Sequence, residues 1–369
     1  MKQLWTDEYY MRMALDLARR GLGKTTPNPM VGCVIVTDCK VVGRGWHDHL
    51  GGLHAEAAAL LDAGEKARGA TAYVTLEPCS HQGRQPPCAP ALVSAGITRC
   101  VCAIGDPNPK VAGRGLQILR EAGIETVCGV LADEAAWLNR GFLSLQVRGR
   151  PWVTLKAAIS VDGSMSLANG ESRWVTGAAA RTAGHLLRSE NDAIVTGSGT
   201  ITVDNPALTV RDVEGTSPRP VVLCADLRCL EGRFKALNER MIVFGVRGTS
   251  VPEQWCKQVH LVPRDAHEGL DLKKVLDKLG QLGLARVLLE AGPRLTSSFI
   301  ASGLVDEYHL FAASKFMGEG RKITTSLHLE HMGESLPIVL CRTRTVGADW
   351  WLEGGNPCSQ DWLNRLARS

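Results

Sequence analysis

The sequence lacks the long apolar segments that a membrane protein needs. No stretch approaches the ~20 consecutive apolar residues of a membrane-spanning helix. The opening residues, MKQLWTDEYYMRMALDLARRG, are charged and amphipathic, whereas a secretory signal has an apolar core. We therefore expect a cytoplasmic protein with no membrane partner.

Charge of one sign is not concentrated in any part of the chain. The net charge of +4 is spread out without a long Lys/Arg run, which disfavours an extended track for nucleic acid. A local pocket for an anionic substrate, such as the phosphate of a small molecule, remains compatible with this balance. We expect no nucleic-acid partner.

Aromatic residues are few, at 5%, but 44% of the 369 residues are hydrophobic and 22% are charged, which is typical of a globular protein. A chain of this length exceeds one ordinary core, so we expect two domains. The twelve cysteines are scattered and accompany no export signal. Most should be reduced, buried side chains.

The first half of the chain alternates helical and strand patterns, which predicts an α/β sheet layered with helices. A β-hairpin is expected over 33–47 around Asp38, Cys39 and Lys40. Helices are expected at 9–20, 54–67, 88–97 and 113–124, and strands at 71–78, 99–109 and 125–131.

The polar segment 146–151, QVRGRP, predicts a boundary near Arg150, with domains at 1–148 and 149–369. Beyond it the alternation resumes without an internal repeat, which predicts a second α/β domain. Strands are expected at 152–160, 192–200, 218–226, 240–246, 258–263 and 286–292, and helices at 180–190, 272–283 and 295–303. The tail beyond Gly354 has no assigned element.

One short span of the first half concentrates metal-binding residue types: His54, Glu56, Cys79 and Cys88. One histidine and two thiolates are the ligand set of a catalytic zinc site, which leaves the fourth position to water. A carboxylate two residues after the histidine fits the first turn of a helix and can carry protons to a leaving amine. Pro78 before Cys79 predicts a second helix start or a tight turn. A structural zinc site, or no metal, is the alternative.

The second half carries weaker signals. Lys156 interrupts an apolar strand and could face water at a sheet edge or project into a cleft. Trp174 could anchor a core or stack on a flat ring. The strand, glycine turn and helix of 289–298 could hold a cofactor phosphate on backbone N–H groups. There is no G-x-G-x-x-G, so an ordinary Rossmann site is not indicated.

Four motifs carry a resemblance to a known family: P-N-P-M-V-G (27–32), H-A-E (54–56), E-P-C-S-H-Q-G-R-Q-P-P-C (77–88) and D-P-N-P-K-V-A-G-R-G (106–115). They resemble the bacterial bifunctional riboflavin-biosynthesis deaminase/reductase, and the resemblance continues through nearly the whole chain. It implies a cytidine-deaminase-like α/β/α layered domain followed by a dihydrofolate-reductase-like α/β domain.

For the first domain, the resemblance implies hydrolytic deamination of a phosphorylated pyrimidine with zinc on His54, Cys79 and Cys88 and Glu56 as proton shuttle. It further implies substrate contacts from Asn28, His47, His81, Arg84 and Asn108. Asn28 and Asn108 are flanked by prolines and could instead only shape turns.

For the second domain, the resemblance implies an NADPH-dependent reduction of the ribosyl group, with Lys156 and Asp204 near the reacting carbon. Implied substrate contacts are Ser172, Arg188, Leu208, Arg211 and Glu290. Implied cofactor contacts are Ala158, Trp174, Thr200, Asp204, Ala225, Gly292, Pro293, Arg294, Leu295, Thr296, Ser297 and Ser298. A solvated surface position for Arg188 is the alternative.

The chain departs from the family at Cys224-Ala225, where relatives commonly have Asp-Ser. The departure removes a carboxylate and a hydroxyl from an implied NADPH contact. The resemblance also implies a homodimer or homotetramer. Two rival functions are a nucleic-acid base deaminase, which the eight residues between Cys79 and Cys88 and the second domain oppose, and a non-catalytic zinc-stabilised regulator.

Overall fold

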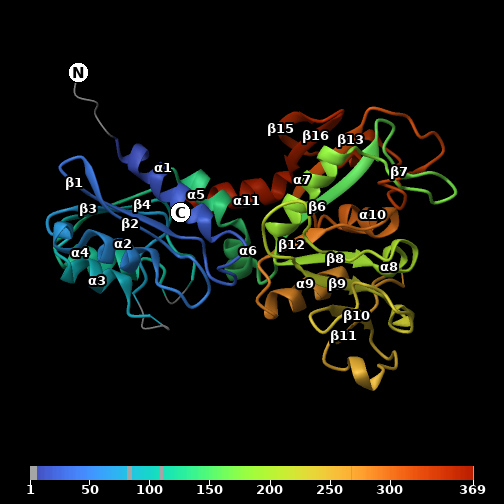
Figure 1. Cartoon of the computed structure of the whole chain (residues 1–369), viewed down its shortest axis with the longest axis horizontal. Coiled ribbons are helices and arrows are strands. Elements are labelled where there is room, and N and C mark those ends of the chain that lie inside the picture. Colours follow the sequence, from blue (N-terminus) through green and yellow to red (C-terminus); the bar gives the residue numbers. More distant parts are fainter. Residues whose placement is uncertain (1–5, 81–84, 109–110, 267, 369) are drawn as a thin grey trace. The chain divides into compact units, whose positions relative to one another are not determined.

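The computed structural model describes residues 6–80, 85–108, 111–266 and 268–368 of the chain. They form two compact units, the first built from the chain up to Arg148 together with the C-terminal segment from Asp361, and the second from Gly149–Gln360 (Figure 1). The main segment of the first unit ends at Arg148, and residues 361–368 group with it.

The first unit contains a five-stranded sheet in the order β2-β1-β3-β4-β5. The strands are β1 (Gly32–Thr37), β2 (Lys40–Trp46), β3 (Thr71–Val74), β4 (Arg99–Cys102) and β5 (Glu125–Cys128). The hairpin β1–β2 turns through Asp38 and Cys39, both at positive φ, as its right-handed twist requires. Strands β3, β4 and β5 run parallel, so their carboxyl ends meet at one edge of the sheet.

Helices cover both faces of this sheet (Figure 1). Their bounds are α1 (Asp7–Ala18), α2 (Ala55–Ala63), α3 (Cys88–Ser94), α4 (Arg114–Glu121), α5 (Ala132–Leu138) and α6 (Arg140–Arg148). Glycines allow the close approach, because a Cβ on Gly32 would lie 1.9 Å from the Ala14 oxygen of α1 and one on Gly45 would lie 2.1 Å from the Ala55 oxygen of α2. Helix α2 and its metal-site residues are therefore fixed tightly against the hairpin.

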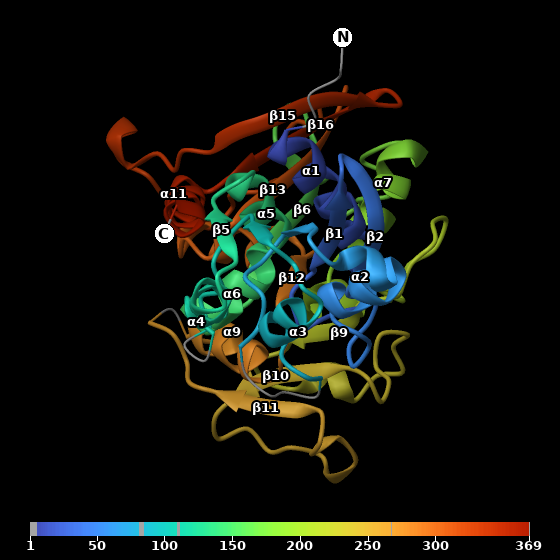
Figure 2. The same ribbon diagram turned by 90° about the vertical axis from the view of Figure 1, so that its left-hand side faces the viewer.

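The second unit contains a nine-stranded sheet in the order β11-β10-β9-β8-β12-β6-β13-β16-β15, whose end strands β11 and β15 lie far apart in Figure 2. The strands are β6 (Trp152–Ser160), β8 (Ala193–Gly197), β9 (Arg219–Leu223), β10 (Ile242–Val246), β11 (Val259–Val262), β12 (Arg286–Leu289), β13 (Glu307–Ala313), β15 (Val339–Val346) and β16 (Asp349–Gly355). A small sheet pairs β7 (Ser164–Ser166) with β14 (Arg321–Lys322).

Helices also cover both faces of the larger sheet, with α9 and α10 packed in one core cluster and α7 and α8 in the other. Their bounds are α7 (Ala178–Ser189), α8 (Ser198–Asp204), α9 (Leu272–Gln281) and α10 (Pro293–Ala301). The last helix, α11 (Pro357–Arg368), lies mostly in the segment that groups with the first unit. Short 3₁₀ helices are Arg19–Gly21, Gly64–Ala67, Arg228–Leu230, Glu253–Trp255 and Met332–Glu334. In the part of the chain that the structure describes, none of the helices combines the length and apolar character needed to cross a membrane.

The expected alternation is confirmed, but several elements were not predicted from the sequence. Strand β13 was missed because its buried Glu307 and His309 interrupt an apolar pattern. Strand β15 was missed because it is largely exposed. Helix α11 occupies the tail to which no element was assigned.

Candidate functional sites

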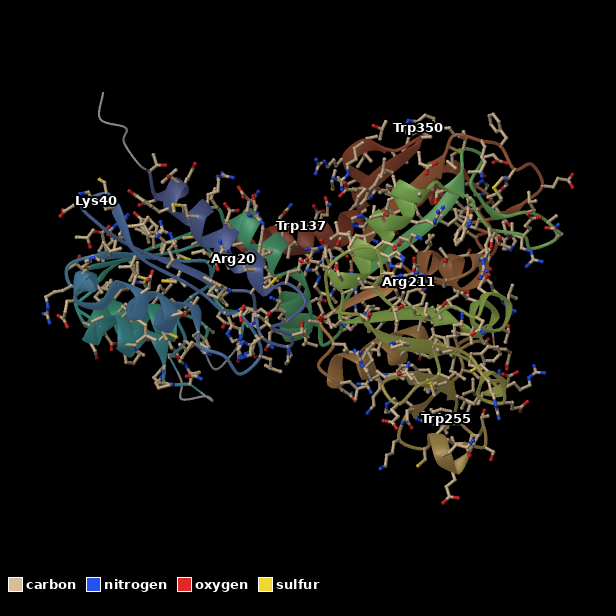
Figure 3. All side chains as sticks on the ribbon, in the orientation of Figure 1. Arg20, Lys40, Trp137, Arg211, Trp255 and Trp350 are labelled. Carbon is tan, nitrogen blue, oxygen red and sulfur yellow. The ribbon has the colours of Figure 1, made fainter. Side chains whose placement is uncertain are left out.

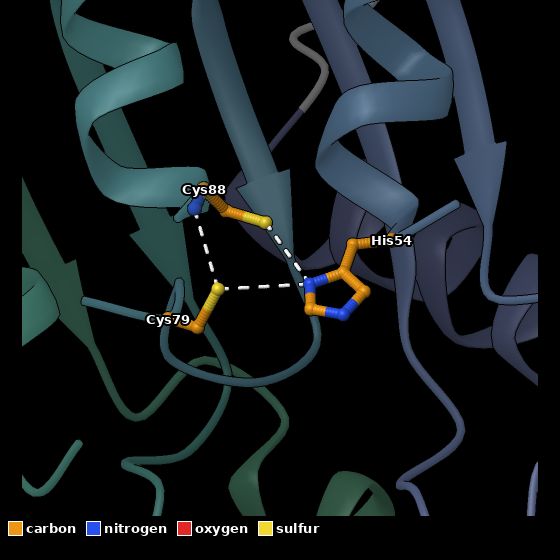
Figure 4. Close-up of side chains that lie close together, drawn as sticks. All are labelled: His54, Cys79 and Cys88. Atoms are coloured by element: carbon orange, nitrogen blue, oxygen red, sulfur yellow. Dashed lines mark hydrogen bonds between the residues drawn. The ribbon is translucent and has the colours of Figure 1, made fainter. Parts of the chain in front are cut away.

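The three residues with metal-binding side chains come from two helix starts and one loop of the first unit. His54 precedes α2 as its N-cap, Cys88 is the first residue of α3, and Cys79 lies in the loop after β3. One ligand atom from each lies within 4.8 Å of the others (Figure 4). The helix starts expected at His54 and Cys88 are confirmed. Pro78 and Cys79, for which a helix start or a tight turn was expected, lie in a loop that does not begin a helix.

The geometry of this cluster fits zinc. Zn–S and Zn–N bonds of about 2.3 and 2.0 Å at a tetrahedral angle place N and S roughly 3.5 Å apart. The His54 Nδ1 atom lies 3.3 Å from Cys88 Sγ and 3.6 Å from Cys79 Sγ. Three protein donors of this kind, with no fourth in the cluster of described residues, match a catalytic site better than a structural one.

Local hydrogen bonds hold Cys79 in the form that binds metal. The Cys88 thiol and the His54 ring lower the pKa of Cys79 to about 4, and the backbone N–H of Cys88 donates to Cys79 Sγ at 3.3 Å. That N–H belongs to the first turn of α3, where the helix dipole favours negative charge. Cys79 is therefore prepared as a thiolate ligand.

Glu56 lies in the first turn of α2 and is only 4% exposed. Burial raises its pKa to about 7, with a further contribution from the charge of Cys79. A hydrogen bond also links its carboxylate with the Cys88 thiol. A carboxyl group that changes protonation near neutral pH beside the metal ligands suits proton transfer.

Asn28 and His47 form a chain of contacts that leads to the metal ligands. The Leu53 carbonyl can only accept, so His47 Nδ1 donates to it at 2.9 Å, and His47 Nε2 accepts from the Asn28 amide at 3.2 Å. The His47 ring centroid is 5.7 Å from that of His54, and burial lowers the pKa of His47. Asn28 therefore does more than shape a turn.

Asn108 is half-buried in a turn in which its N–H donates to Asp106 Oδ1 at 2.9 Å. His81 and Arg84 lie outside the described residues. The sequence analysis missed Glu77, a 3% exposed carboxylate two residues before Cys79. An acidic residue directly before the P-C pair was the available signal.

In the second unit, Lys156, Arg188 and Glu290 form one ion cluster. Lys156 Nζ lies 2.9 Å from Glu290 Oε1, and Arg188 reaches Glu290 Oε2 with Nε at 2.8 Å and Nη2 at 2.6 Å. Strand β6 lies between β12 and β13, so Lys156 is not on an edge strand. The Arg188 side chain is 16% exposed, which excludes the solvated surface position.

Electrostatics keep Glu290 ionised inside this cluster. Burial opposes its charge, but Lys156 and Arg188 outweigh burial and lower the pKa of Glu290 to about 2. The carboxylate therefore holds the two cations in place at neutral pH. Lys156 also lies 6.0 Å from the centroid of the Phe311 ring on β13.

The loop after α8 is tied to this cluster through α7. Arg188 Nη1 donates to the Thr209 carbonyl at 3.1 Å, and the Arg211 N–H donates to His185 Nδ1, also at 3.1 Å. Leu208 is buried, whereas the Arg211 side chain is exposed (Figure 3). Asp204, the last residue of α8, pairs with Arg173 at 3.5 Å rather than with Lys156.

Trp174 is 63% exposed, so it does not anchor a core. The Arg181 guanidinium lies 4.4 Å from its ring centroid. Ser172, in the same segment, is half-buried and accepts a backbone hydrogen bond from Val175. An exposed indole beside a polar loop leaves the stacking platform as the remaining interpretation.

Two glycine turns at the ends of neighbouring strands β8 and β12 fit a cofactor phosphate. Gly292 is the N-cap of α10 and supplies no side-chain cap, so the first backbone N–H groups of that helix can bind an anion. A Cβ on Gly292 would lie 3.7 Å from Thr200 Oγ1, and one on Gly197 would lie 3.4 Å from Leu295 Cδ2. The two turns are therefore adjacent, as an NADPH site there requires.

The other implied cofactor residues differ in how they could contribute. Thr296 and Ser297 are fully buried, and their hydroxyls bond the Ala291 carbonyl and the Ser326 N–H. The Thr296 N–H also donates to the Gly292 carbonyl at 3.1 Å, so the side chain and the N–H of Thr296 are both engaged within the protein. Arg294 is exposed on the first turn of α10, whereas Pro293, directly before it, and Ser298, four residues after it, are half-buried. Ala158 lies on β6 beyond Lys156, and Ala225 follows β9 beside the buried Cys224.

Two family models match separate parts of the chain. The cytidine and deoxycytidylate deaminase zinc-binding region matches residues 4–104, and the RibD C-terminal domain matches residues 151–352. The first match contains His54, Cys79 and Cys88, and the second contains Lys156, Arg188 and Glu290. The metal-ligand cluster and the ion cluster therefore each lie within one matched region, whereas Asn108 lies just beyond the first.

Similar proteins match over nearly the full chain. Riboflavin biosynthesis protein RibD of Escherichia coli is 41% identical over 357 residues, covering 93% of this chain and 97% of the relative. The Aquifex aeolicus RibD is 40% identical, covering 93% and 96%.

Solved structures of similar proteins match the fold of this chain over nearly its full length. Form 2 of Acinetobacter baumannii RibD has a TM-score of 0.86 at 40% identity and covers 95% of this chain and 98% of its own. A Thermotoga maritima diaminohydroxyphosphoribosylaminopyrimidine deaminase/5-amino-6-(5-phosphoribosylamino)uracil reductase has a TM-score of 0.85 at 31% identity, with the same coverage.

Proposed function

The chain belongs to the family of the bifunctional riboflavin-biosynthesis protein RibD, and from this premise we propose which residues of its two units perform the deaminase and reductase reactions. The first unit is a zinc-dependent deaminase with a cytidine-deaminase-like fold. The second is an NADPH-dependent reductase with a fold like that of dihydrofolate reductase. We propose residues 1–148 and 149–360 as the two catalytic domains.

The proposed substrate of the first unit is 2,5-diamino-6-ribosylamino-4(3H)-pyrimidinone 5′-phosphate, from which the 2-amino group is removed. His54, Cys79 and Cys88 would hold zinc. Zinc, when bound, supplies a nucleophile at neutral pH by lowering the pKa of bound water to about 7. Glu56 takes up the proton on its carboxylate and returns it to the leaving amine.

The remaining residues of the first site orient the pyrimidine. The fixed tautomer of His47 leaves the Asn28 amide oxygen free to accept from the ring substituents. Asn108 is placed on the adjacent loop at the carboxyl edge of the sheet. His81 and Arg84, whose residue types suit a phosphate, are assigned to substrate binding from the resemblance alone.

The observation that carries this proposal is the buried carboxyl group of Glu56 beside three converging zinc donors. Glu56→Gln should retain zinc and lower the rate of ammonia release by roughly 10²- to 10⁴-fold, the usual contribution of acid–base catalysis. Glu65→Gln, which changes an exposed carboxylate of the same unit, is the matched control. Unchanged ammonia release by Glu56→Gln would refute the assigned role.

The second unit is proposed to reduce the ribosyl group of 5-amino-6-(5-phosphoribosylamino)uracil to ribityl. NADPH, when bound, supplies the hydride. Its phosphates would lie on the N–H groups at the start of α10, with Gly197–Thr200 beside them and Trp174 as a platform for a ring. Ala225 has no polar side chain with which to distinguish NADPH from NADH.

Lys156 is proposed to polarise the C1′ oxygen or nitrogen that ring opening exposes, through an Nζ hydrogen bond. Glu290 and Arg188 fix the position of that ammonium. Asp204, Ser172, Leu208 and Arg211 are proposed at the substrate phosphate and ribosyl group.

The test of the second assignment follows NADPH oxidation directly, with the deaminated pyrimidine supplied as substrate. Lys156→Met should lower the turnover number and leave ammonia release from the first substrate unchanged. Lys274→Met, which changes an exposed lysine of α9, is the control. Equal NADPH oxidation by Lys156→Met and wild type would contradict the role of Lys156.

A further inference from the structure

The carboxylate of Glu77 accepts a set of hydrogen bonds that the zinc chemistry does not explain. Its carboxylate is 3% exposed and accepts four backbone N–H groups. Oε2 accepts from Asp106 at 3.2 Å and Gly113 at 2.9 Å, and Oε1 accepts from Gly115 at 2.9 Å and Leu116 at 3.2 Å. Among the ion pairs of the described residues, none ends on Glu77.

Three of these four donors belong to the start of α4. Gly113 is the N-cap of α4 and provides no side-chain cap, while Gly115 and Leu116 lie in its first turn. The first N–H groups of a helix have no partner within the helix, and its dipole favours a negative charge there. Glu77 therefore caps α4 from a distant part of the chain.

The same contact brings α4 against the loop that carries a metal ligand. A Cβ on Gly115 would lie 1.8 Å from the Pro78 oxygen, so only glycine allows this approach. Pro78 directly precedes Cys79. The Glu77 N–H also donates to the Ile104 carbonyl at 2.9 Å, and the Cys79 carbonyl accepts from the Ala89 N–H at 3.1 Å. The backbone on both sides of Pro78 is thus held from several directions.

We propose that Glu77 is a positioning residue that joins the Cys79 loop to the start of α4 and to Asp106, which lies two residues before Asn108. By fixing the two loops to each other, it would set the position of one zinc ligand and one substrate-binding loop while touching neither zinc nor pyrimidine. This inference rests on the proposed deaminase function.

Glu77→Gln tests the proposal with little change in shape. An amide offers one acceptor oxygen where the carboxylate offers two, and its NH₂ group would face backbone N–H groups. Partners behind metal ligands change metal affinity or activity by roughly 10- to 100-fold. We expect Glu77→Gln to accelerate zinc loss to a chelator by this factor and to raise the KM for the pyrimidine several-fold.

The decisive measurement is the absorption spectrum of the Co²⁺-loaded protein, because its ligand-field bands report the geometry at Cys79. A change of fold stability alone would lower the melting temperature without shifting these bands. Glu121→Gln, on the exposed side of α4, is the matched control and should behave as wild type in all three measurements. NADPH oxidation by the second unit should be unchanged in every variant.

Gly113→Ala provides an independent variant if Glu77→Gln does not fold. Gly113 has φ +82°, and a Cβ there would meet no atom within 4 Å. Alanine should therefore strain the backbone at the start of α4 without a steric clash and without removing the Glu77 carboxylate. We expect a smaller shift of the same Co²⁺ bands. Wild-type spectra and zinc release in both variants would overturn the positioning role. A wild-type protein that binds no zinc and releases no ammonia would instead overturn the proposed deaminase function.

Discussion

The two candidate sites are built in opposite ways. In the deaminase unit, the donor atoms of His54, Cys79 and Cys88 all lie within 4.8 Å of one another. In the reductase unit, Lys156 and Arg188 already neutralise Glu290. The first site is a cluster of metal-binding side chains, whereas the second is a self-paired charge cluster beside two glycine turns.

This difference determines where each site obtains its rigidity. The proposed zinc ligands are positioned by two helix starts and by the loop that Glu77 contacts, so mainly backbone hydrogen bonds fix their positions. Lys156, Arg188 and Glu290 come from a strand, a helix and the end of another strand, and their mutual charges order them. Removing a ligand should therefore affect chemistry most in the first unit, while removing a charge should affect stability most in the second.

The largest effect is expected for His54→Ala. Loss of one zinc ligand should lower zinc content and reduce ammonia release by more than about 100-fold, because even partners behind the ligands cost 10- to 100-fold. Metal analysis and an ammonia assay measure this, and NADPH oxidation serves as the internal control. An equal fall in NADPH oxidation would show that the two sites are not separable.

A large effect on stability is expected for Glu290→Gln. Lys156 and Arg188 would remain mostly buried without their carboxylate, which should destabilise the second unit by roughly 3 kcal/mol. Urea unfolding followed by tryptophan fluorescence, which does not depend on catalysis, measures the change. Glu268→Gln, at an exposed ion pair with Arg264, is the control and should change stability by less than about 0.5 kcal/mol. Similar midpoints for the two variants would contradict the role of the cluster.

The loss of folding stability at acidic pH provides a further test of this difference between the two sites. The pKa of Glu290 falls from 4.5 to about 2 on folding, so its ionisation stabilises the folded state above pH 4.5. That contribution, on the order of 3 kcal/mol, should disappear as the pH falls from 4.5 toward 2. Unfolding of the second unit at a series of pH values should show a shallower loss over this range for Glu290→Gln than for wild type. Parallel curves would exclude a depressed pKa.

The smallest effect is expected for Trp174→Ala. The exposed indole should contribute less than about 0.5 kcal/mol to stability. As a stacking platform it should nevertheless affect the KM for NADPH, which we expect to rise several-fold. Trp350→Ala, at another exposed tryptophan of the second unit, is the control and should leave this KM unchanged. An unchanged KM in Trp174→Ala would remove Trp174 from the cofactor site.

The cluster of proposed zinc ligands was predictable because its residue types lie at short spacing in the chain. His54 and Glu56 are two residues apart at the start of one helix, and eight residues separate Cys79 from Cys88. The charge cluster was not predictable from residue types alone, since Lys156 and Arg188 each had an ordinary surface interpretation. Only the sheet order, which puts β6 at the centre of the sheet, showed that Lys156 is enclosed. Glu77 was missed because its partners are backbone amides, which leave no pattern in the side chains.

The sequence by itself determined the two alternating α/β halves and, through its motifs, the family, and it predicted the zinc donor set, because periodicity and local spacing are properties of the chain. The tertiary structure decided that β13, β15 and β16 complete the second sheet and that Glu290 is the common partner of Lys156 and Arg188. It also decided that one buried carboxylate joins two loops of the deaminase site. These features depend on residues far apart in the chain, and only folding brings their charges and hydrogen-bonding groups within reach of each other.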